Sequence, residues 1–316
     1  MRLEHRTSDT VTAPAALLIL PRLFAFFCAD APYSAAGALG MLLAVIPQAA
    51  VLFLLTRRRE PLTFPPRMLQ FCRGGAVLYA ADLTVHFRTL CRSLLLPHSG
   101  VMLLLLAALL LYALRQPEHA CGRAAELLLF AAAAGLILLP FGTFGTMRGI
   151  TLFMPDSIAA GFFCELRQSG GLLLIPLLMQ KQSPGTARRV LSAWILARGV
   201  LLPLLVLFGT MQNGRLRGRI GNPFFLLLAR TPLTEAIRTD GFWILCAFAC
   251  GGLCIAACLR IAAQKETRPL QCFLPYCAAA ALFLLLPPAR LLLYAATVLT
   301  GAALPFTRQI QRRCAL

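Results

Sequence analysis

The stretch VMLLLLAALLLYAL, residues 101–114, decides the class of fold. It contains no charged side chain, and Tyr112 is its only residue with a polar group. A helix needs roughly 20 predominantly apolar residues to span a bilayer, and runs of this kind recur along the whole chain. The stretch therefore predicts one of several membrane-spanning helices.

Composition supports the same class of protein. Hydrophobic residues make up 59% of the 316 positions and charged residues 13%, and the mean hydropathy is +0.76. Average soluble domains carry roughly 45–50% apolar and about 25% charged residues. A soluble globular protein of this size has no means of hiding so much apolar surface, and a disordered chain has far less of it. We therefore expect an all-α polytopic membrane protein.

Apolar runs bounded by charged or turn residues give about ten candidate spans within a single transmembrane domain over residues 1–316. The first is expected to be a retained span and not a signal peptide, because Pro21 and Arg22 interrupt it and further spans follow at once. The ten runs cover residues 14–32, 36–55, 68–90, 99–114, 121–140, 155–180, 187–211, 241–262, 271–287 and 289–306.

The net charge of +18 is divided among short segments between these runs. With both termini in the cytoplasm, the cytoplasmic segments hold seventeen Lys and Arg residues and the opposite side holds eight. Positive residues hold short loops on the cytoplasmic side. We therefore expect a multi-pass cell-membrane protein that contacts lipid and not nucleic acid. The longest connection, 212–240, contains an apolar stretch at 222–230 that predicts an interfacial or re-entrant helix.

Two runs are interrupted. Pro21 divides the first, and the segment 168–171 (QSGG) divides the sixth. These runs hold matching positions in two five-helix halves, about 14–140 and 155–306. Paired breaks indicate a transporter-type binding site, because unwinding frees backbone groups that a ligand or ion must satisfy. A proline kink and an ordinary helix–loop–helix are the alternative.

A series of short motifs follows the broken sixth run. They are the run 172–179 with its Pro176, a seventh run ending at Gly209, NPFFLLLAR at 222–230, EAIRTDGFW at 235–243, and Leu304-Pro305 with a basic tail at 308–313. The N-terminal half adds only layout, with Arg88 near the end of the third run and RAAE at 123–126 opening the fifth. In this order the motifs resemble the endospore germination permeases, the B subunits of nutrient germinant receptors, within the amino acid–polyamine–organocation superfamily.

The resemblance implies ten spans in a 5+5 inverted-repeat, LeuT-like transporter fold. It also implies recognition, with or without transport, of amino acids or similar small nutrients, and partnership with receptor A and C subunits in the spore inner membrane. Two alternatives stay open. One is an amino-acid or polyamine transporter unrelated to sporulation, and the other is a non-transporting membrane scaffold subunit.

The expected ligand site lies at the two breaks, where half-helix N-termini face a carboxylate. The first run has no glycine before Gly37, so a pocket packed shut by Phe24, Phe26 and Phe27 would favour the scaffold. The expected substrate-binding residues are Phe24, Ala25, Cys28, Tyr79, Asp82, Ser169, Gly170 and Gly171.

Acidic residues inside apolar runs are functional candidates by default. Glu165 is expected either to address a ligand ammonium or a proton, or to pair locally with Arg167 or Arg88. Asp82 is expected either to line the cavity or to pair with a structural partner such as Arg198.

The sequence contains no zinc-type His-Glu-x-x-His, no phosphate loop and no Gly-x-Ser-x-Gly elbow,. We therefore expect neither an enzyme nor a bound cofactor. Four cysteines, 246, 250, 254 and 258, recur every fourth residue. A single straight helix cannot converge them on one metal ion, so this stripe predicts close helix packing.

Overall fold

In a computed structural model of the chain, the described residues are 11–28, 34–57, 61–93, 99–116, 118–143, 156–180, 182–213, 240–263 and 269–306. Every regular element in these ranges is helical, which confirms the all-α prediction for this part of the chain. The predicted helix at 222–230, most of the 235–243 motif and the basic tail at 308–313 lie outside the described residues.

The described helices follow one another along the chain, with shorter helical turns between some of them. Their bounds are α1 Thr12–Cys28, α2 Ala35–Thr56, α3 Pro66–Ser93, α4 Ser99–Arg115, α5 Glu118–Thr143, α6 Asp156–Arg167, η2 Ser169–Leu173, α7 Ile175–Met179, α8 Pro184–Leu196, η3 Ala197–Leu201, α9 Leu202–Asn213, α11 Asp240–Ala263, α12 Pro269–Leu285, η5 Pro287–Arg290, α13 Leu291–Ala303 and η6 Leu304–Phe306. The segment η3 is π-helical, and η2, η5 and η6 are 3₁₀ turns.

Each predicted apolar run falls on helical structure over its described residues. Shorter apolar helices run over Thr12–Cys28, Gly100–Arg115 and Gln271–Leu285. Among the described residues, the segments long and apolar enough to cross a bilayer are Ala35–Thr56, Ile158–Met179, Pro184–Met211, Ile244–Ala263 and Pro287–Phe306. These helices are typical of a membrane-embedded protein.

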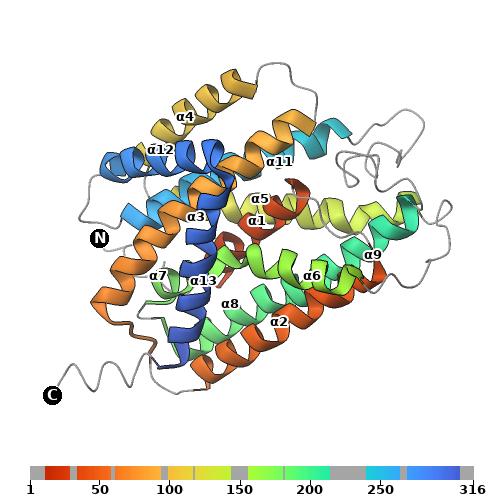
Figure 1. The fold of residues 1–316 in the computed structure, drawn as a ribbon, viewed down its shortest axis with the longest axis horizontal. Helices are drawn as coiled ribbons and strands as arrows, with labels where there is room; N and C mark the ends of the chain where they lie inside the picture. The colour runs from red at the N-terminus through yellow and green to blue at the C-terminus, as the bar shows by residue number, and fades with distance from the viewer. Residues whose placement is uncertain are drawn as a thin grey trace, which may run out of the picture.

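The helices α1 and α3 occupy the middle of the bundle, with α4 and α12 on one side and α2, α8 and α9 on the other (Figure 1). The helix α11 packs against both α1 and α3, and α6 lies along α2. This arrangement brings the ends of α1, α3, α6 and α13 to one region of the molecule.

The contact between α2 and α6 is the most extensive in the described structure, and glycine makes it possible. A Cβ added at Gly40 would overlap the carbonyl oxygen of Ile158, and one added at Gly161 would overlap that of Gly37. Small residues of this kind let helix backbones touch in a membrane, where burial of apolar surface does not drive association.

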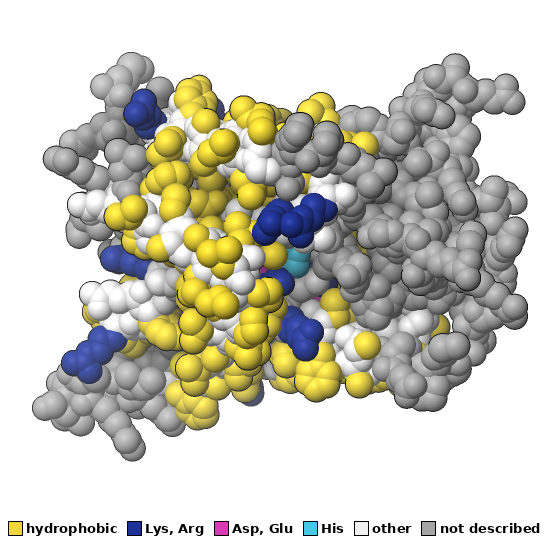
Figure 2. Space-filling model, turned by 45° about the horizontal axis from the view of Figure 1, so that its top comes forward, with side chains coloured by type: hydrophobic (Ala, Val, Ile, Leu, Met, Phe, Trp, Pro, Cys, Tyr) yellow, Lys and Arg dark blue, Asp and Glu magenta, His cyan; other side chains and the backbone are white. Residues whose placement is uncertain are grey.

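Apolar side chains also cover the outside of the bundle. Hydrophobic residues dominate the described part of the face in Figure 2, with Lys and Arg side chains scattered over it. Leu104, Phe130, Leu245 and Leu274 are all strongly exposed, and they come from four different helices. An apolar surface of this extent needs a lipid or protein environment.

The predicted break of the first run at Pro21 is wrong for the described residues. The helix α1 continues from Thr12 to Cys28 with Pro21 inside it. Proline is tolerated in a membrane helix where neighbouring helices satisfy the freed carbonyl group. The sixth run does change conformation, because α6 ends at Arg167 and the chain tightens into the 3₁₀ turn of η2.

The cysteine stripe lies on α11 and packs as expected. Cys250, Cys254 and Cys258 are buried and Cys246 is half-buried. The Sγ atoms of Cys250 and Cys254 lie 3.8 Å apart. Within the described part of the chain, no group of three or more His, Cys, Asp or Glu residues is arranged to hold a metal ion.

Candidate functional site

A buried cluster of three charges joins three helical segments beside the 3₁₀ turn. The Nη2 atom of Arg22 on α1 lies 2.5 Å from Oε2 of Glu165 on α6, and the Nε atom of Arg198 lies 2.7 Å from Oε1. The exposed fractions of these side chains are 3% for Arg22, 0% for Glu165 and 1% for Arg198. We call these residues the Glu165 cluster. It carries two positive charges and one negative charge away from water.

The π-helical turn sets the position of Arg198 in this cluster. Arg198 lies in η3, and π turns inside α-helices often mark functional positions,. Its Nη1 atom donates to Gln48 Oε1 at 2.6 Å and its Nη2 atom to Ser169 Oγ at 2.8 Å. The guanidinium also lies over the Trp194 ring, 4.4 Å from the centroid, as a cation–π contact,. The Arg198 guanidinium is therefore held by an ion pair, two hydrogen bonds and an aromatic contact.

Arg22 is less completely bound. Its Nε and Nη1 atoms are buried and have no hydrogen-bond partner in the described structure. Breaking a buried ion pair by removing one partner costs about 3–5 kcal/mol, because the other charge is left uncompensated. Glu165 therefore holds both guanidinium groups in the bundle.

The glycines of the 3₁₀ turn contact aromatic rings. A Cβ at Gly170 would overlap the Tyr79 ring, and one at Gly171 would lie 3.1 Å from Cζ2 of Trp194. The Ser169 hydroxyl donates to the backbone carbonyl of Glu165 at 2.9 Å, so the turn satisfies that carbonyl itself. The two glycines therefore let Tyr79 and Trp194 reach the backbone.

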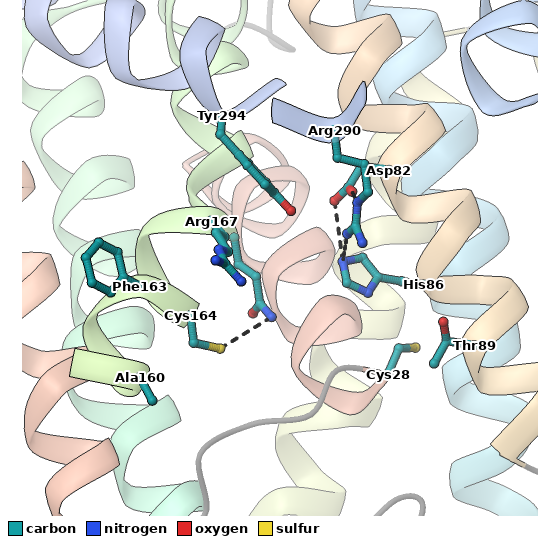
Figure 3. A pocket seen from close by; sticks show the side chains of 11 residues that line it. Cys28, Asp82, His86, Thr89, Ala160, Phe163, Cys164, Arg167, Arg290 and Tyr294 are labelled. Carbon is teal, nitrogen blue, oxygen red and sulfur yellow. Dashed lines mark hydrogen bonds and ion pairs between the residues drawn. The ribbon is translucent and has the colours of Figure 1, made fainter. Parts of the chain in front are cut away.

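Next to the Glu165 cluster is a cavity of about 540 Å³. We call it the α3–α6–α13 cavity, and Figure 3 shows its side chains converging from these helices and from the end of α1. Its lining runs from a buried floor to an exposed rim. The lining residues are Cys28, Asp82, His86, Thr89, Ala160, Phe163, Cys164, Arg167, Gln168, Arg290 and Tyr294.

An ion pair forms the buried end of the cavity. The Nε atom of Arg290 lies 2.5 Å from Oδ1 of Asp82, and Nε2 of His86 lies 3.4 Å from Oδ2. The Nη2 atom of Arg290 also lies 3.3 Å from His86 Nε2. Asp82 and His86 are one helical turn apart on α3, whereas Arg290 ends the 3₁₀ turn η5. The three groups therefore tie α3 to the start of α13.

The opposite wall belongs to α6. Arg167 is exposed and has no ion-pair partner among the described residues. The Tyr294 hydroxyl points into the space between Arg167 and the Asp82–Arg290 pair (Figure 3). Two arginines, Arg167 and Arg290, oppose one aspartate, Asp82, so the Arg and Asp side chains that line the cavity carry an excess of one positive charge. This arrangement suits a small polar solute that brings a carboxylate.

The predicted site residues divide into two groups. Cys28 and Asp82 line the cavity. Phe24, Ala25 and Tyr79 are buried in the packed interior, where the Phe24 ring lies against Gly251 of α11. The segment Ser169–Leu173, which holds Ser169, Gly170 and Gly171, is also buried.

The partners expected for the two acids were not the observed ones. Glu165 pairs with Arg22 and Arg198, not with Arg167 or Arg88. Asp82 pairs with Arg290 and His86, not with Arg198.

A signal for these pairs is present in the sequence. Arg22, Arg198 and Arg290 lie within or at the edge of apolar runs, where a charge needs an opposite charge,. Arg73, Arg88 and Arg167 also lie in such runs, so this signal points to arginines as partners of the two acids but does not assign the pairs.

Other polar pairs fix the surrounding helices. Thr84 Oγ1 on α3 lies 2.8 Å from the Tyr276 hydroxyl on α12. The Glu126 side chain accepts a hydrogen bond from Thr12, so it ties α5 to the first residue of α1.

Comparison with protein-family models, curated proteins and solved structures gave no match to this chain in any of the three.

Proposed function

We propose that this protein is a ten-span membrane protein that recognises a small carboxylate-bearing nutrient, of the amino-acid class, in the α3–α6–α13 cavity. The observation that carries the proposal is that Arg167, which is exposed and has no ion-pair partner among the described residues, lines a polar cavity of about 540 Å³. Pockets of about 300–1,000 Å³ with a few convergent polar groups are typical of small-molecule sites.

In the proposed topology the cavity lies on the outer side of the membrane, from which a nutrient would reach the protein. With both termini cytoplasmic, α1 and α3 end on the outer side, and α6 and α13 begin there. Cys28, Thr89, Ala160 and Arg290 lie at these outer ends. The cavity would then face the side from which nutrients arrive. The 5+5 inverted repeat, over about 14–140 and 155–306, is part of this proposal.

The proposed setting is a nutrient germinant receptor, with an A subunit and a lipoprotein C subunit as partners. It rests on the order of the motifs from Gln168 onward. The cavity also fits the recognition of amino acids or related nutrients at a membrane, which this setting requires. A transporter outside sporulation would share the cavity and differ in its partners.

The closed interior favours sensing over transport. Phe24, Phe26 and Phe27 are buried, and the Glu165 cluster lies in the same part of the bundle. A solute in the α3–α6–α13 cavity would need these groups to move before it could cross. The same packing supports a scaffold subunit as the second candidate function.

The test is the thermal stability of the detergent-purified protein against a panel of amino acids, sugars and nucleosides. A ligand that binds only the folded state raises the melting midpoint, with about 2.7 kcal/mol of stabilisation at 100 times its dissociation constant. We expect one amino-acid class to raise the midpoint of the wild type. We expect the same response in Arg115→Gln, which changes an exposed arginine at the end of α4. A flat panel on folded protein would contradict recognition by this chain and favour the scaffold.

A further inference from the structure

A second cavity, of about 640 Å³, opens between α3 and α12 with walls from α11 and α13. We call it the α3–α12 groove. It shares no lining residue with the α3–α6–α13 cavity. Most of its surface is apolar, and its polar side chains come from the N-terminal parts of α3 and α12. The lining residues are Gln70, Phe71, Arg73, Gly74, Gly75, Val77, Leu78, Ala262, Gln271, Cys272, Pro275, Ala279 and Ala296.

Two adjacent glycines give the groove its shape. A Cβ added at Gly74 would meet no atom within 4 Å, so this position faces open space. A Cβ at Gly75 would press on the Leu173 side chain, so the second glycine faces the packed interior. On α12, Pro275 and Ala279 lie one turn apart along the groove. The result is an elongated apolar trough against bare helix backbone.

Arg73 lies at the polar end of this trough. Its Nε atom is buried and has no hydrogen-bond partner in the described structure. Arg73 is seven residues from the start of α3 at Pro66, or about 10 Å along a helix axis,. Gln70 and Gln271, which carry amide donors, lie near the same ends of their helices. No Asp or Glu is among the described residues that line the groove, so none of them balances the charge of Arg73.

We propose that the α3–α12 groove binds an anionic phospholipid, with the phosphate on Arg73 and the two glutamines and one acyl chain along Gly74, Pro275 and Ala279. A phosphodiester supplies an acceptor for the unpartnered Nε atom of Arg73 and can also accept from the two amides. Arg binds phosphate with two parallel hydrogen bonds. The apolar trough excludes a free phosphate as the full occupant, because most of its wall would stay unfilled. The inference needs only that the helices lie in a bilayer, and not that the other cavity binds a nutrient.

The experiment is native mass spectrometry of the full chain from micelles doped with dioleoyl phosphatidylglycerol or dioleoyl phosphatidylcholine. The two lipids share acyl chains and differ in headgroup charge. A Lys or Arg near the membrane surface contributes about 1 kcal/mol toward anionic lipid, which corresponds to about a fivefold preference. We therefore expect the wild type to retain one phosphatidylglycerol with about fivefold higher affinity than phosphatidylcholine.

Two variants separate charge from shape. Arg73→Gln removes the charge, and we expect the preference for phosphatidylglycerol to disappear while either lipid still binds. At Gly74 an added Cβ meets open space and leucine is the better helix former,, so we expect Gly74→Leu to occupy the trough, lose both lipids and stay folded. The matched controls are Arg92→Gln at the other end of α3 and Gly100→Leu on α4, where an added Cβ also meets no atom within 4 Å.

Equal binding of the two lipids by the wild type would overturn the proposal. It would also fail if Gly74→Leu kept the bound phosphatidylglycerol, or if Arg92→Gln removed the headgroup preference as fully as Arg73→Gln. The melting midpoint of each variant in lipid-free detergent serves as the folding control. If inorganic phosphate competed with phosphatidylglycerol in the wild type and bound Gly74→Leu with the same affinity, the site would belong to the anion alone and the lipid proposal would be overturned.

Discussion

Two carboxylates lie inside this bundle, each held by guanidinium groups, yet their surroundings differ. Glu165 is 0% exposed and bound by two arginines that are 3% and 1% exposed. Asp82 is 4% exposed, but its partner Arg290 is 23% exposed and lines a cavity. The Glu165 cluster has no access to solvent, whereas the Asp82–Arg290 pair borders a space that a solute can enter. The same chemistry therefore serves helix packing at Glu165 and suits ligand recognition at Asp82.

The largest expected effect on stability comes from breaking the Glu165 cluster. Glu165→Gln leaves two buried guanidinium groups without a counter-charge, and we expect a loss of about 3–5 kcal/mol in unfolding free energy. The measurement is SDS titration in mixed micelles, followed by tryptophan fluorescence.

A triple variant tests whether the loss comes from uncompensated charge. Replacing Arg22 and Arg198 by Met together with Glu165→Leu removes all three charges, and exchanges of this kind are often neutral or stabilising. The wild-type hydrogen bond of 3.0 Å from Gln48 Nε2 to Ser169 Oγ does not involve the three exchanged residues, whereas Gln48 Oε1 loses its Arg198 donor. A triple variant as unstable as Glu165→Gln would contradict the electrostatic account of this cluster.

The glycine pair gives the next largest effect. A Cβ at Gly170 overlaps the Tyr79 ring, and overpacking of a dense core costs about 1–3 kcal/mol. We therefore expect Gly170→Ala to lower the unfolding free energy by about that amount, measured by the same titration. In a Tyr79→Ala background, Gly170→Ala should cost much less.

The matched control for this substitution is Gly74→Ala, where the added methyl group meets open space. It should leave stability unchanged or slightly raised, because alanine is the better helix former. If Gly170→Ala were as well tolerated as Gly74→Ala, the 3₁₀ turn would not be packed against Tyr79 as described.

The Asp82–Arg290 pair should contribute less to the unfolding free energy than the Glu165 cluster. Asp82→Asn keeps an acceptor for Arg290 and removes the charge, and partly exposed Arg290 is free to regain water. We expect a loss of about 1–2 kcal/mol in unfolding free energy, clearly less than for Glu165→Gln. A loss as large as that of Glu165→Gln would show that the two carboxylates do not differ in the way described.

The smallest effect concerns accessibility and not stability. Cys164 lines the cavity and is half-buried, whereas Cys258 is buried in α11. In variants that keep one of these cysteines, a small methanethiosulfonate reagent should label Cys164 faster than Cys258 while the melting midpoint stays the same. Mass spectrometry of the labelled protein gives the rates, and equal rates would place Cys164 outside an open cavity.

The location of the helices was predictable because the bilayer imposes it. A span needs roughly 20 apolar residues, and this requirement is local in sequence. The run at 101–114 became α4, and the cysteine stripe packed in α11. The break at 168–171 was also visible, since paired glycines weaken a helix,.

The site was less predictable, because its contacts join distant parts of the chain. The partners of Glu165 are 143 and 33 residues away, and Arg290 is 208 residues from Asp82. Sequence spacing carries no information on such pairs without knowledge of which helices touch. The contact of Gly170 with the Tyr79 ring was hidden for a related reason, since a glycine that admits a ligand and one that admits an aromatic ring look the same in sequence.

The most direct test of ligand recognition in the α3–α6–α13 cavity is whether Arg167 binds the carboxylate of the ligand. For the amino acid that stabilises the protein, equilibrium dialysis would compare its binding with that of the matching amine, which lacks the carboxylate, in wild type and in Arg167→Gln. The wild type should prefer the amino acid by at least tenfold, which corresponds to about 1.4 kcal/mol, and Arg167→Gln should bind the two compounds equally. A full preference retained in Arg167→Gln would contradict recognition in the α3–α6–α13 cavity.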